Sequence, residues 1–316
     1  MKILIVCSSR AKNEGYFIDE QVADLRSAGH VAEYFYILKR GLWGYFISWL
    51  PLVIKILVYK PDVVHAHYGL SGFIAVLQPF RPVVLTVHGG DIYDRRVARI
   101  TRIAASLARQ VIAVNEDISK MIGRKQGVRV LPCAVNTKLF MPVDRGLARE
   151  KLGIDPSVPM VLFSSRFERK VKNAPLAKRA VELSVMHPVL TEVFQIPRDR
   201  MPLLINAADL LLVTSFYEGS PQIVKEAMAC NIPVVSTDVG DIRKNFDDLE
   251  GYYITGFDAA AIAVKIDEAI LYRRTAVETK GRARIFQVGL DTETITTALL
   301  EIYSSVCKRK KRTDEN

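Results

Sequence analysis

Two carboxylates stand eight residues apart in the stretch Glu218-Gly219-Ser220-Pro221-Gln222-Ile223-Val224-Lys225-Glu226. Pro221 has a fixed φ and no N–H, so it suits the first position of a helix, and Ser220 before it is a common N-cap residue. No Glu or Gln stands at Ile223 to close a capping box, so we expect first-turn amides to remain available to an anion. A rise of 1.5 Å per residue predicts about 8–12 Å between the two carboxylates, more than the ~5 Å of paired carboxyls in a retaining glycosidase. We infer that they hold two ends of one long ligand.

The chain alternates short apolar runs with amphipathic stretches, which is the pattern of βα units that form a parallel sheet. Strands are expected at residues 2–7, 31–37, 63–67, 83–88, 111–114 and 128–131, then at 160–164, 190–196, 210–214, 234–237 and 252–254. The segment 136–159 is rich in Pro and Gly and is expected to be a linker. The sequence therefore predicts two doubly wound α/β domains, residues 1–158 and 159–291, with ligand sites at the carboxyl ends of the strands. A last helix at about 292–306 and a basic tail at 307–316 are expected to follow.

The composition indicates a soluble globular protein, because 49% of the 316 residues are hydrophobic and 25% are charged. The four cysteines are scattered and show no metal-binding or CxxC spacing, which favours reduced thiols in a cytoplasmic protein. The formal net charge of +10 suits an anionic partner such as nucleic acid, an anionic membrane or a phosphorylated small molecule. The sequence has no helix-turn-helix, zinc-finger or RNP-type motif, so we expect no nucleic-acid partner.

The E-x7-E stretch resembles a known family when its flanking residues are included. These are Ala208-Asp209-Leu210-Leu211-Leu212-Val213-Thr214-Ser215 before it and Val234-Val235-Ser236-Thr237-Asp238-Val239-Gly240 after it. Together they are similar to family 4 glycosyltransferases, which are retaining enzymes of the GT-B fold, and most like bacterial enzymes that build surface polysaccharides such as capsule or teichuronic acid. The resemblance covers most of the chain. It implies two Rossmann-like domains facing a cleft, an N-terminal one for the acceptor and a C-terminal one for the nucleotide sugar, with the last helix packing back on the first.

The resemblance also assigns roles within the stretch. It implies that Glu218 faces the donor sugar and that Glu226 holds the ribose of the nucleotide. The start of the helix is expected to hold the donor diphosphate, through Ser220, Pro221, Gln222 and Ile223.

Basic residues follow the strand expected at 160–164. In the family, an Arg after this strand and a Lys several residues later bind the donor diphosphate and stabilise the departing nucleotide, and Arg166 and Lys172 match that placement. Ser165 and Asn173 stand where the family has glycines, so Lys170 remains an alternative to Lys172.

A second motif, Thr86-Val87-His88-Gly89-Gly90-Asp91, resembles the family's T-x-H-G-x-D, whose His contacts the donor sugar. His88 and Glu218 are therefore the expected catalytic residues. Asp91 either orients this loop or caps the next helix. Gly15 is carried over as a diphosphate-binding residue, although the family often has a Gly-Gly pair in this loop and the chain has one glycine.

We expect neither a metal nor a cofactor. His65 and His67 are alternate residues of a strand and point to the same face, but no third ligand stands at a suitable spacing. The resemblance implies a metal-independent retaining glycosyltransferase that moves a sugar from a nucleotide-diphospho-sugar, such as a UDP- or GDP-sugar, to a sugar or lipid-linked acceptor hydroxyl. Bacterial polysaccharide or glycolipid biosynthesis is the expected setting.

The fold class is compatible with three alternatives to sugar transfer. A dinucleotide-dependent oxidoreductase would carry G-x-G-x-x-G after the first strand, and residues 7–15 lack it. A sugar-nucleotide epimerase of the GT-B fold and a non-catalytic sugar-nucleotide-binding partner subunit stay open as alternatives to transfer.

The segment 42–58 concentrates apolar and aromatic residues but is interrupted by Pro51 and Lys55 and is short for a bilayer span. It fits either an interfacial helix or a core helix of the first domain. The basic run 308–312 is either a solvated tail or a weak membrane anchor. The expected location is the cytoplasm, either free or peripheral on the inner face of the cell membrane.

Overall fold

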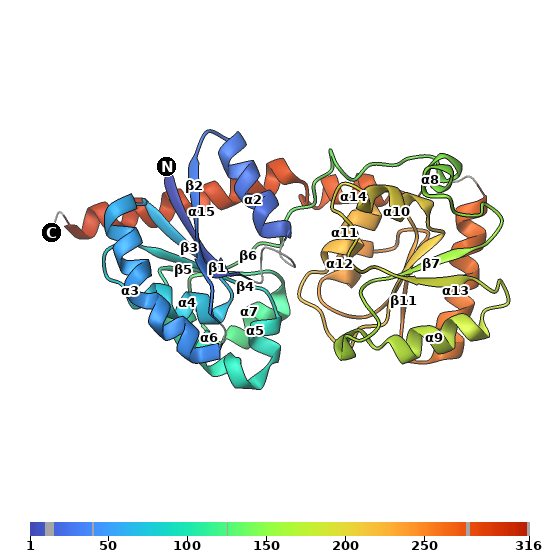
Figure 1. Ribbon diagram of the computed structural model, residues 1–316, viewed down its shortest axis with the longest axis horizontal. Coiled ribbons are helices and arrows are strands. Elements are labelled where there is room, and N and C mark those ends of the chain that lie inside the picture. Colours follow the sequence, from blue (N-terminus) through green and yellow to red (C-terminus); the bar gives the residue numbers. More distant parts are fainter. Residues whose placement is uncertain (10–15, 40, 125, 276–278, 315–316) are drawn as a thin grey trace. The chain divides into compact units, whose positions relative to one another are not determined.

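The computed structural model describes residues 1–9, 16–39, 41–124, 126–275 and 279–314 (Figure 1). The chain forms two compact units, the first made of Met1–Ala134 and Thr292–Asn316 and the second of Val135–Asp291. Each unit has its own parallel sheet with helices on both faces. The predicted architecture of two doubly wound parallel-sheet domains is therefore confirmed.

The first unit contains a six-stranded sheet in the order β2-β1-β3-β4-β5-β6. Its strands are β1 (Lys2–Ser8), β2 (Val31–Ile37), β3 (Val63–His67), β4 (Val83–Val87), β5 (Gln110–Ala113) and β6 (Val128–Val130). One face is covered by α3 (Gly41–Tyr59), α4 (Gly69–Val76), α6 (Arg95–Leu107) and α7 (Glu116–Ile122), and the other by α2 (Tyr16–Ser27) and α15 (Thr292–Asp314). The short α5 (Gly90–Tyr93) follows β4. Because both faces are covered, the central strands are buried throughout, which explains their unbroken apolar runs.

The second unit contains a five-stranded sheet in the order β11-β10-β9-β7-β8. Its strands are β7 (Met160–Phe163), β8 (Val189–Glu192), β9 (Leu210–Val213), β10 (Val234–Thr237) and β11 (Tyr252–Thr255). One face packs against α8 (Arg145–Leu152), α10 (Met201–Ala207), α11 (Gln222–Ala229), α12 (Ile242–Phe246) and α14 (Gly281–Gln287), and the other against α9 (Ala174–Leu183) and α13 (Ala259–Arg274). A single 3-10 turn, η1 (Lys170–Lys172), lies between β7 and α9.

All of the expected strands are present, and those at 31–37, 63–67 and 234–237 have the predicted bounds. The largest difference is at β8, which ends at Glu192 rather than at residue 196. Gln195 has φ 53°, a left-handed conformation that a continuous strand does not allow, and Pro197 follows it. The chain therefore turns here and leads directly to α10.

The segment 136–159 is not the linker that the sequence suggested, because it contains α8 and belongs to the second unit. The side chain of Asp144 accepts a hydrogen bond from the Leu147 amide at the start of α8, and Gly153 ends the helix with φ 66°. The division between the units falls at Ala134 and Val135 rather than at residue 158.

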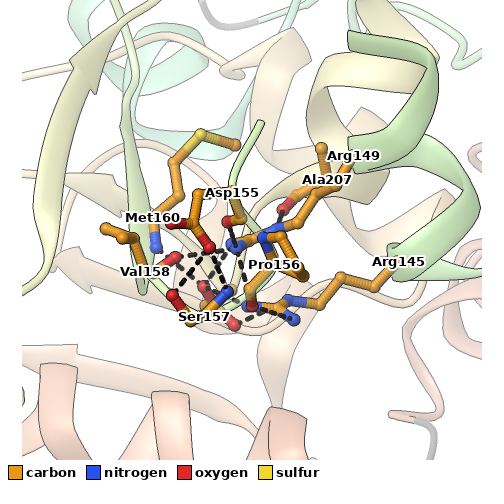
Figure 2. A network of polar contacts seen from close by, with 9 residues as sticks. Arg145, Arg149, Asp155, Pro156, Ser157, Val158, Met160 and Ala207 are labelled. Carbon is orange, nitrogen blue, oxygen red and sulfur yellow. Dashed lines mark hydrogen bonds and ion pairs between the residues drawn. The ribbon is translucent and has the colours of Figure 1, made fainter. Parts of the chain in front are cut away.

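A buried arginine fixes α8 to the second unit (Figure 2). Arg149 is fully buried and donates to the carbonyls of Ala207 (2.8 Å) and Val158 (2.7 Å) and to the carboxylate of Asp209 (2.8 Å). Asp209, also fully buried, accepts a further bond of 2.7 Å from the Met160 amide at the start of β7. Burial lowers the pKa of the Arg149 guanidinium, and the neighbouring Asp209 opposes this change. This network connects α8 with the beginnings of β7 and β9.

The last helix also differs from its prediction. α15 continues to Asp314 instead of ending at about residue 306, so the expected basic tail 307–316 is helical as far as residue 314. Lys and Arg are good helix formers and are favoured near the carboxyl end of a helix dipole. Buried residues of α15, among them Leu299, Tyr303 and Val306, pack in the core of the first unit.

We predict that Arg149→Met will strongly destabilise the second unit. The substitution removes the fully buried partner of the Asp209 carboxylate and leaves it Arg145, whose side chain is 23% exposed; breaking a buried pair costs about 3–5 kcal/mol. At roughly 2–4 °C per kcal/mol, Tm should fall by about 10 °C in a thermal melt. Arg179→Ala is the matched control, because its pair with Glu182 is exposed and should contribute less than about 1 kcal/mol. Equal melting curves for the two variants would contradict the role given to Arg149.

Candidate functional site

Three loops of the second unit meet at the carboxyl ends of β7, β9 and β10. The Thr214 hydroxyl donates to the Lys172 carbonyl (2.8 Å), and the Phe216 amide donates to the Val171 carbonyl (2.9 Å). The Thr237 hydroxyl, at the end of β10, donates to the Ser215 carbonyl (2.8 Å). Because parallel neighbours end at the same edge of a sheet, residues far apart in sequence become one surface here.

Glu218 is held by two hydrogen-bond donors in this region. Its Oε1 accepts from Lys172 Nζ and from Ser215 Oγ, both at 2.6 Å. Lys172 is 7% exposed, whereas Lys170 is exposed, so the structure places Lys172 and not Lys170 beside Glu218. Asn173 adopts φ 53°, the left-handed conformation that Gly and Asn tolerate, which explains how it stands where the resemblance expects glycine.

Glu226 lies on α11 and is almost fully buried, with 4% exposure. Its Oε1 accepts a charge-assisted bond of 2.7 Å from Nη1 of Arg198. The Arg198 guanidinium also lies over the ring of Phe140, 4.5 Å from its centroid. Arg198 was not singled out from the sequence. The signal for it was indirect, since a carboxylate among apolar helix residues is rarely buried unless it is paired.

The start of α11 differs from the sequence prediction. Ser220 is not the N-cap, because its hydroxyl donates to Asp241 Oδ2 (2.6 Å) and Pro221 occupies the cap position before Gln222. The fully buried Lys225 donates to the Ser220 hydroxyl (3.1 Å). No side chain caps α11 among the described residues. The predicted diphosphate-binding residues Gln222 and Ile223 thus form the first turn of this helix, beside a buried cation.

Gly240 fixes the position of the Glu218 loop from the β10 side. It has φ 62°, and a Cβ at this position would lie 2.5 Å from the Gly219 carbonyl oxygen. Both observations require glycine, so the loops after β9 and β10 pack backbone against backbone.

Arg166 lies apart from these pairs. Its side chain is exposed at the end of β7, with the guanidinium 5.4 Å from the Phe194 ring centroid. Among the described residues it makes no ion pair with Glu218 or Glu226. Its expected contact with a donor diphosphate stays a prediction.

In the first unit, Asp91 orients the loop that carries His88. Its carboxylate accepts bonds from the amides of His88 (3.1 Å), Gly89 (3.0 Å) and Gly69 (2.9 Å). Burial raises the pKa of Asp91 to about 6, and these amide bonds oppose the shift. Gly89 has φ 111°, which only glycine adopts readily. The side chain of Asp91 therefore acts on the loop, the first of the two roles considered for it.

The ring of His88 lies beside that of His67, with His67 Nδ1 3.0 Å from His88 Nε2. His65 and His67 do share a face, and their ring centroids are 4.3 Å apart. No group of three or more His, Cys, Asp or Glu side chains suited to a metal ion occurs in the part of the chain that the structure describes. Gly15 lies outside the described residues.

Two family models match the chain. The one described as Glycosyltransferase Family 4 matches residues 3–139, and the one described as Glycosyl transferases group 1 matches residues 190–285. Among curated relatives, the TuaC glycosyltransferase assigned to teichuronic acid biosynthesis in Bacillus subtilis is 27% identical over 65% of this chain. A D-inositol 3-phosphate glycosyltransferase of Xylanimonas cellulosilytica is 26% identical over 79% of this chain and 73% of its own. The chain spans 60% of the length of the TuaC relative.

Solved structures share the fold at lower identity. Sucrose-phosphate synthase from Thermosynechococcus elongatus has a TM-score of 0.81 at 20% identity, covering 96% of this chain and 98% of that one. HepE of Anabaena, solved with UDP and glucose, has a TM-score of 0.75 at 18% identity, covering 96% and 100%. The chain thus has two parallel-sheet units with the GT-B fold of these neighbours, and it is similar to the two glycosyltransferase family models over residues 3–139 and 190–285.

Proposed function

We propose that the protein transfers a sugar, with retention of anomeric configuration, from a nucleoside-diphospho-sugar to an acceptor hydroxyl. The observation that carries the proposal is the pairing of both glutamates of the E-x7-E stretch with cations. Lys172 contacts Glu218 and Arg198 contacts Glu226, each within 2.7 Å. Such a surface offers positive charge to a diphosphate and carboxylates to sugar hydroxyls.

The chemistry requires charge stabilisation above all. The bond between the anomeric carbon and the phosphate oxygen breaks, the sugar becomes oxocarbenium-like, and the nucleoside diphosphate leaves with the electron pair. Lys172, Arg166 and the first turn of α11 would stabilise the charge that develops on the leaving group. The acceptor oxygen then bonds to the anomeric carbon on the same face, and its proton passes to the departing phosphate.

Glu218 and Lys172 need not separate completely when the donor binds. A lysine ammonium has three N–H donors, so Lys172 can keep its hydrogen bond to Glu218 while it also donates to a phosphate oxygen. Glu218 is proposed to accept hydrogen bonds from sugar hydroxyls, and His88 is proposed to contact the donor sugar, as the family resemblance implies.

Glu226 is proposed to accept hydrogen bonds from the ribose, with Arg198 holding its carboxylate in place. The Anabaena neighbour was solved with UDP, which makes uridine the first nucleoside to test. Neither a metal nor a cofactor is required by this scheme.

The acceptor is proposed to be membrane-associated. One side of α3 is buried through Leu52 and Ile56, so the helix packs in the core of the first unit, which was one of the two predictions for segment 42–58. Its other side exposes a stripe of apolar residues at helical spacing, Trp43, Phe46, Leu50, Ile54 and Leu57. No helix in the described ranges combines the length and apolar character needed to cross a bilayer.

Positive charge lies near this stripe. α3 and α6 both pack against α4 on one face of the first sheet (Figure 1), and α6 exposes Arg95, Arg96, Arg99 and Arg102. Exposed aromatic and basic side chains on one face suit the surface of an anionic bilayer. A surface polysaccharide or glycolipid precursor on a lipid carrier is the acceptor class that fits such a surface, and the teichuronic acid relative agrees with it.

The central test is a thermal-shift panel with UDP, GDP, ADP and their sugar conjugates, followed by product analysis. Binding at a hundredfold excess over Kd stabilises by about 2.7 kcal/mol and should raise Tm by several degrees. With the stabilising donor and a lipid-linked sugar acceptor, NMR of the product should show the anomeric configuration of the donor. Conversion of the donor without an acceptor would indicate an epimerase. Binding without turnover would indicate a partner subunit.

We predict that Lys172→Met will reduce kcat of transfer by roughly 10²-fold or more, since loss of one preorganised donor to a developing anion has that size. Lys170→Met is the control, because Lys170 is exposed two residues away and should leave kcat unchanged. Single-turnover kinetics with the stabilising donor would measure both. A reversed result would reassign the phosphate contact to Lys170.

Substitutions of the two glutamates should affect different constants, Kd for the nucleoside diphosphate at Glu226 and kcat at Glu218. Glu226→Ala removes a charge-assisted contact of about 1.5–3 kcal/mol, so Kd for the nucleoside diphosphate should rise roughly 10–150-fold in calorimetry. Glu218→Ala should lower kcat while Kd for the nucleoside diphosphate stays close to that of the wild type. If Glu218→Ala keeps full kcat, its proposed contact with the sugar is wrong.

We predict that Trp43→Ser combined with Phe46→Ser will weaken co-sedimentation with anionic lipid vesicles by about tenfold or more, because two exposed aromatic anchors are lost. The control pair is Leu271→Ser with Phe286→Ser, which removes two apolar side chains of the second unit that are also exposed, by 55% and 49% against 72% and 69% for Trp43 and Phe46. Equal binding by both double variants would exclude α3 as the membrane-facing surface.

A further inference from the structure

A stack of histidine rings lies at the carboxyl ends of β3 and β4 in the first unit. The ring centroids of His65 and His67 are 4.3 Å apart, and those of His67 and His88 are 5.2 Å apart. His65 is fixed from both sides, by the Thr86 hydroxyl at Nε2 (2.7 Å) and by the Tyr303 hydroxyl at Nδ1 (2.6 Å). The position of His67 is therefore set by its contacts with the buried His65 and the half-buried His88.

His67 can carry only one ring proton. It is fully buried, and burial lowers its pKa to about 3, so the ring is neutral at physiological pH. Nδ1 contacts His88 Nε2 at 3.0 Å, while Nε2 is buried and has no hydrogen-bond partner in the described ranges of the chain.

The unpartnered nitrogen decides where that proton lies. A proton on Nε2 would be a buried donor without an acceptor, which costs about 1–3 kcal/mol, and orphaned N–H groups are rarer in proteins than orphaned acceptors. A proton on Nδ1 makes the bond to His88 and leaves only a lone pair at Nε2. His67 therefore donates from Nδ1, and His88 accepts at Nε2.

We propose that His67 is a positioning residue that holds His88 as a neutral ring with its proton on Nδ1. Since Nε2 of His88 already accepts a hydrogen bond, a neutral His88 must carry its proton on the other nitrogen. A charged His88 is disfavoured by the same contact, because its Nε2–H would face the Nδ1–H of His67. Nδ1 of His88 lies 3.9 Å from the Cys133 sulfur, which is a weak hydrogen-bond partner that an oxygen of a ligand can replace.

The tautomer assignment stands on contacts within the first unit, whereas its use in sugar transfer rests on the proposed function. In that function, His88 gives the donor sugar an uncharged N–H donor of fixed direction. A cation at the same place would repel an oxocarbenium-like sugar.

Histidine-selective ¹⁵N labelling tests the tautomer without any assay of activity. The chain has only five histidines, so long-range ¹H–¹⁵N spectra near neutral pH should resolve them, with His187→Ala in the second unit helping the assignment. Wild-type His88 should show a protonated Nδ1 and a bare Nε2. A wild-type His88 protonated on Nε2 would overturn the proposal.

Two substitutions of His67 test whether this residue sets the tautomer of His88. His67→Phe keeps a ring in the stack but removes the donor, so His88 should change to the Nε2–H form that imidazole prefers in water. His67→Asn places an amide N–H near the position of Nδ1, so it should retain the wild-type tautomer. If His67→Phe folds and leaves His88 unchanged, His67 does not set the tautomer. If His67→Phe does not fold, the other two spectra test the proposal, because both the wild type and His67→Asn should show His88 with its proton on Nδ1.

Kinetics connect the assignment with function. His67→Phe should lower kcat of transfer on the order of tenfold or more, as loss of a residue that orients a reactive histidine does, while Kd for the nucleoside diphosphate is unchanged. His67→Asn should recover part of the rate. A protein that shows the predicted spectra but no transfer with any donor would contradict the proposed function and leave the tautomer assignment intact.

Discussion

The ion pair between Lys172 and Glu218 joins the loops that leave β7 and β9, with Nζ and Oε1 2.6 Å apart. These two strands are parallel neighbours, so their carboxyl ends lie together although the residues are 46 positions apart. Asn173 in its left-handed conformation turns the chain after Lys172, and Gly240 allows the third loop to press on Gly219. The position of the proposed catalytic carboxylate thus depends on backbone geometry in three separate loops, and two of them, after β7 and β10, contain a residue with positive φ.

Buried charge is used differently in two parts of the second unit. Arg149 and Asp209 are both fully buried. Arg149 donates to carbonyls and to Asp209, and Asp209 also pairs with Arg145 and accepts from the Met160 amide, so the network holds α8 in place. Arg198 and Lys172 retain some exposure, with side chains 20% and 9% exposed, and they contact Glu226 and Glu218 respectively. A cation in the second setting can exchange part of its interaction with a carboxylate for one with a phosphate at little desolvation cost. This contrast supports ligand binding at Lys172, and at the Glu226 carboxylate that Arg198 holds, rather than at the Arg149 network.

Most of the fold was predictable because parallel strands covered on both faces must be apolar throughout, and such runs are visible in the sequence. α8 was missed because Gly146, Gly153 and Pro156 resemble a linker, although Asp144 as N-cap and Gly153 as C-terminal stop were available as signals. The glutamates and Lys172 were predicted from their motif, and the structure places Lys172 beside Glu218. Arg198, Ser215 and Asp241 were not, because their contacts depend on how loops meet in three dimensions. Ser220 was misassigned for the same reason, since a serine before a helix can cap it or, as here, donate to a carboxylate of another loop.

The two units offer different electrostatic environments for the proposed reaction. Those residues of the second unit that are proposed to hold the diphosphate are charged, which suits a leaving group that gains negative charge. Burial lowers the pKa of His65 and His67 in the histidine stack of the first unit, and the outermost ring, His88, is proposed to donate a hydrogen bond without adding charge. An oxocarbenium-like sugar is stabilised by carboxylates and tolerates neutral donors, whereas its diphosphate requires cations. A lysine in place of His88 would put a positive charge where the contact with the sugar is proposed, and it would raise the energy of an oxocarbenium-like sugar. The neutral imidazole that His67 is proposed to fix avoids that charge.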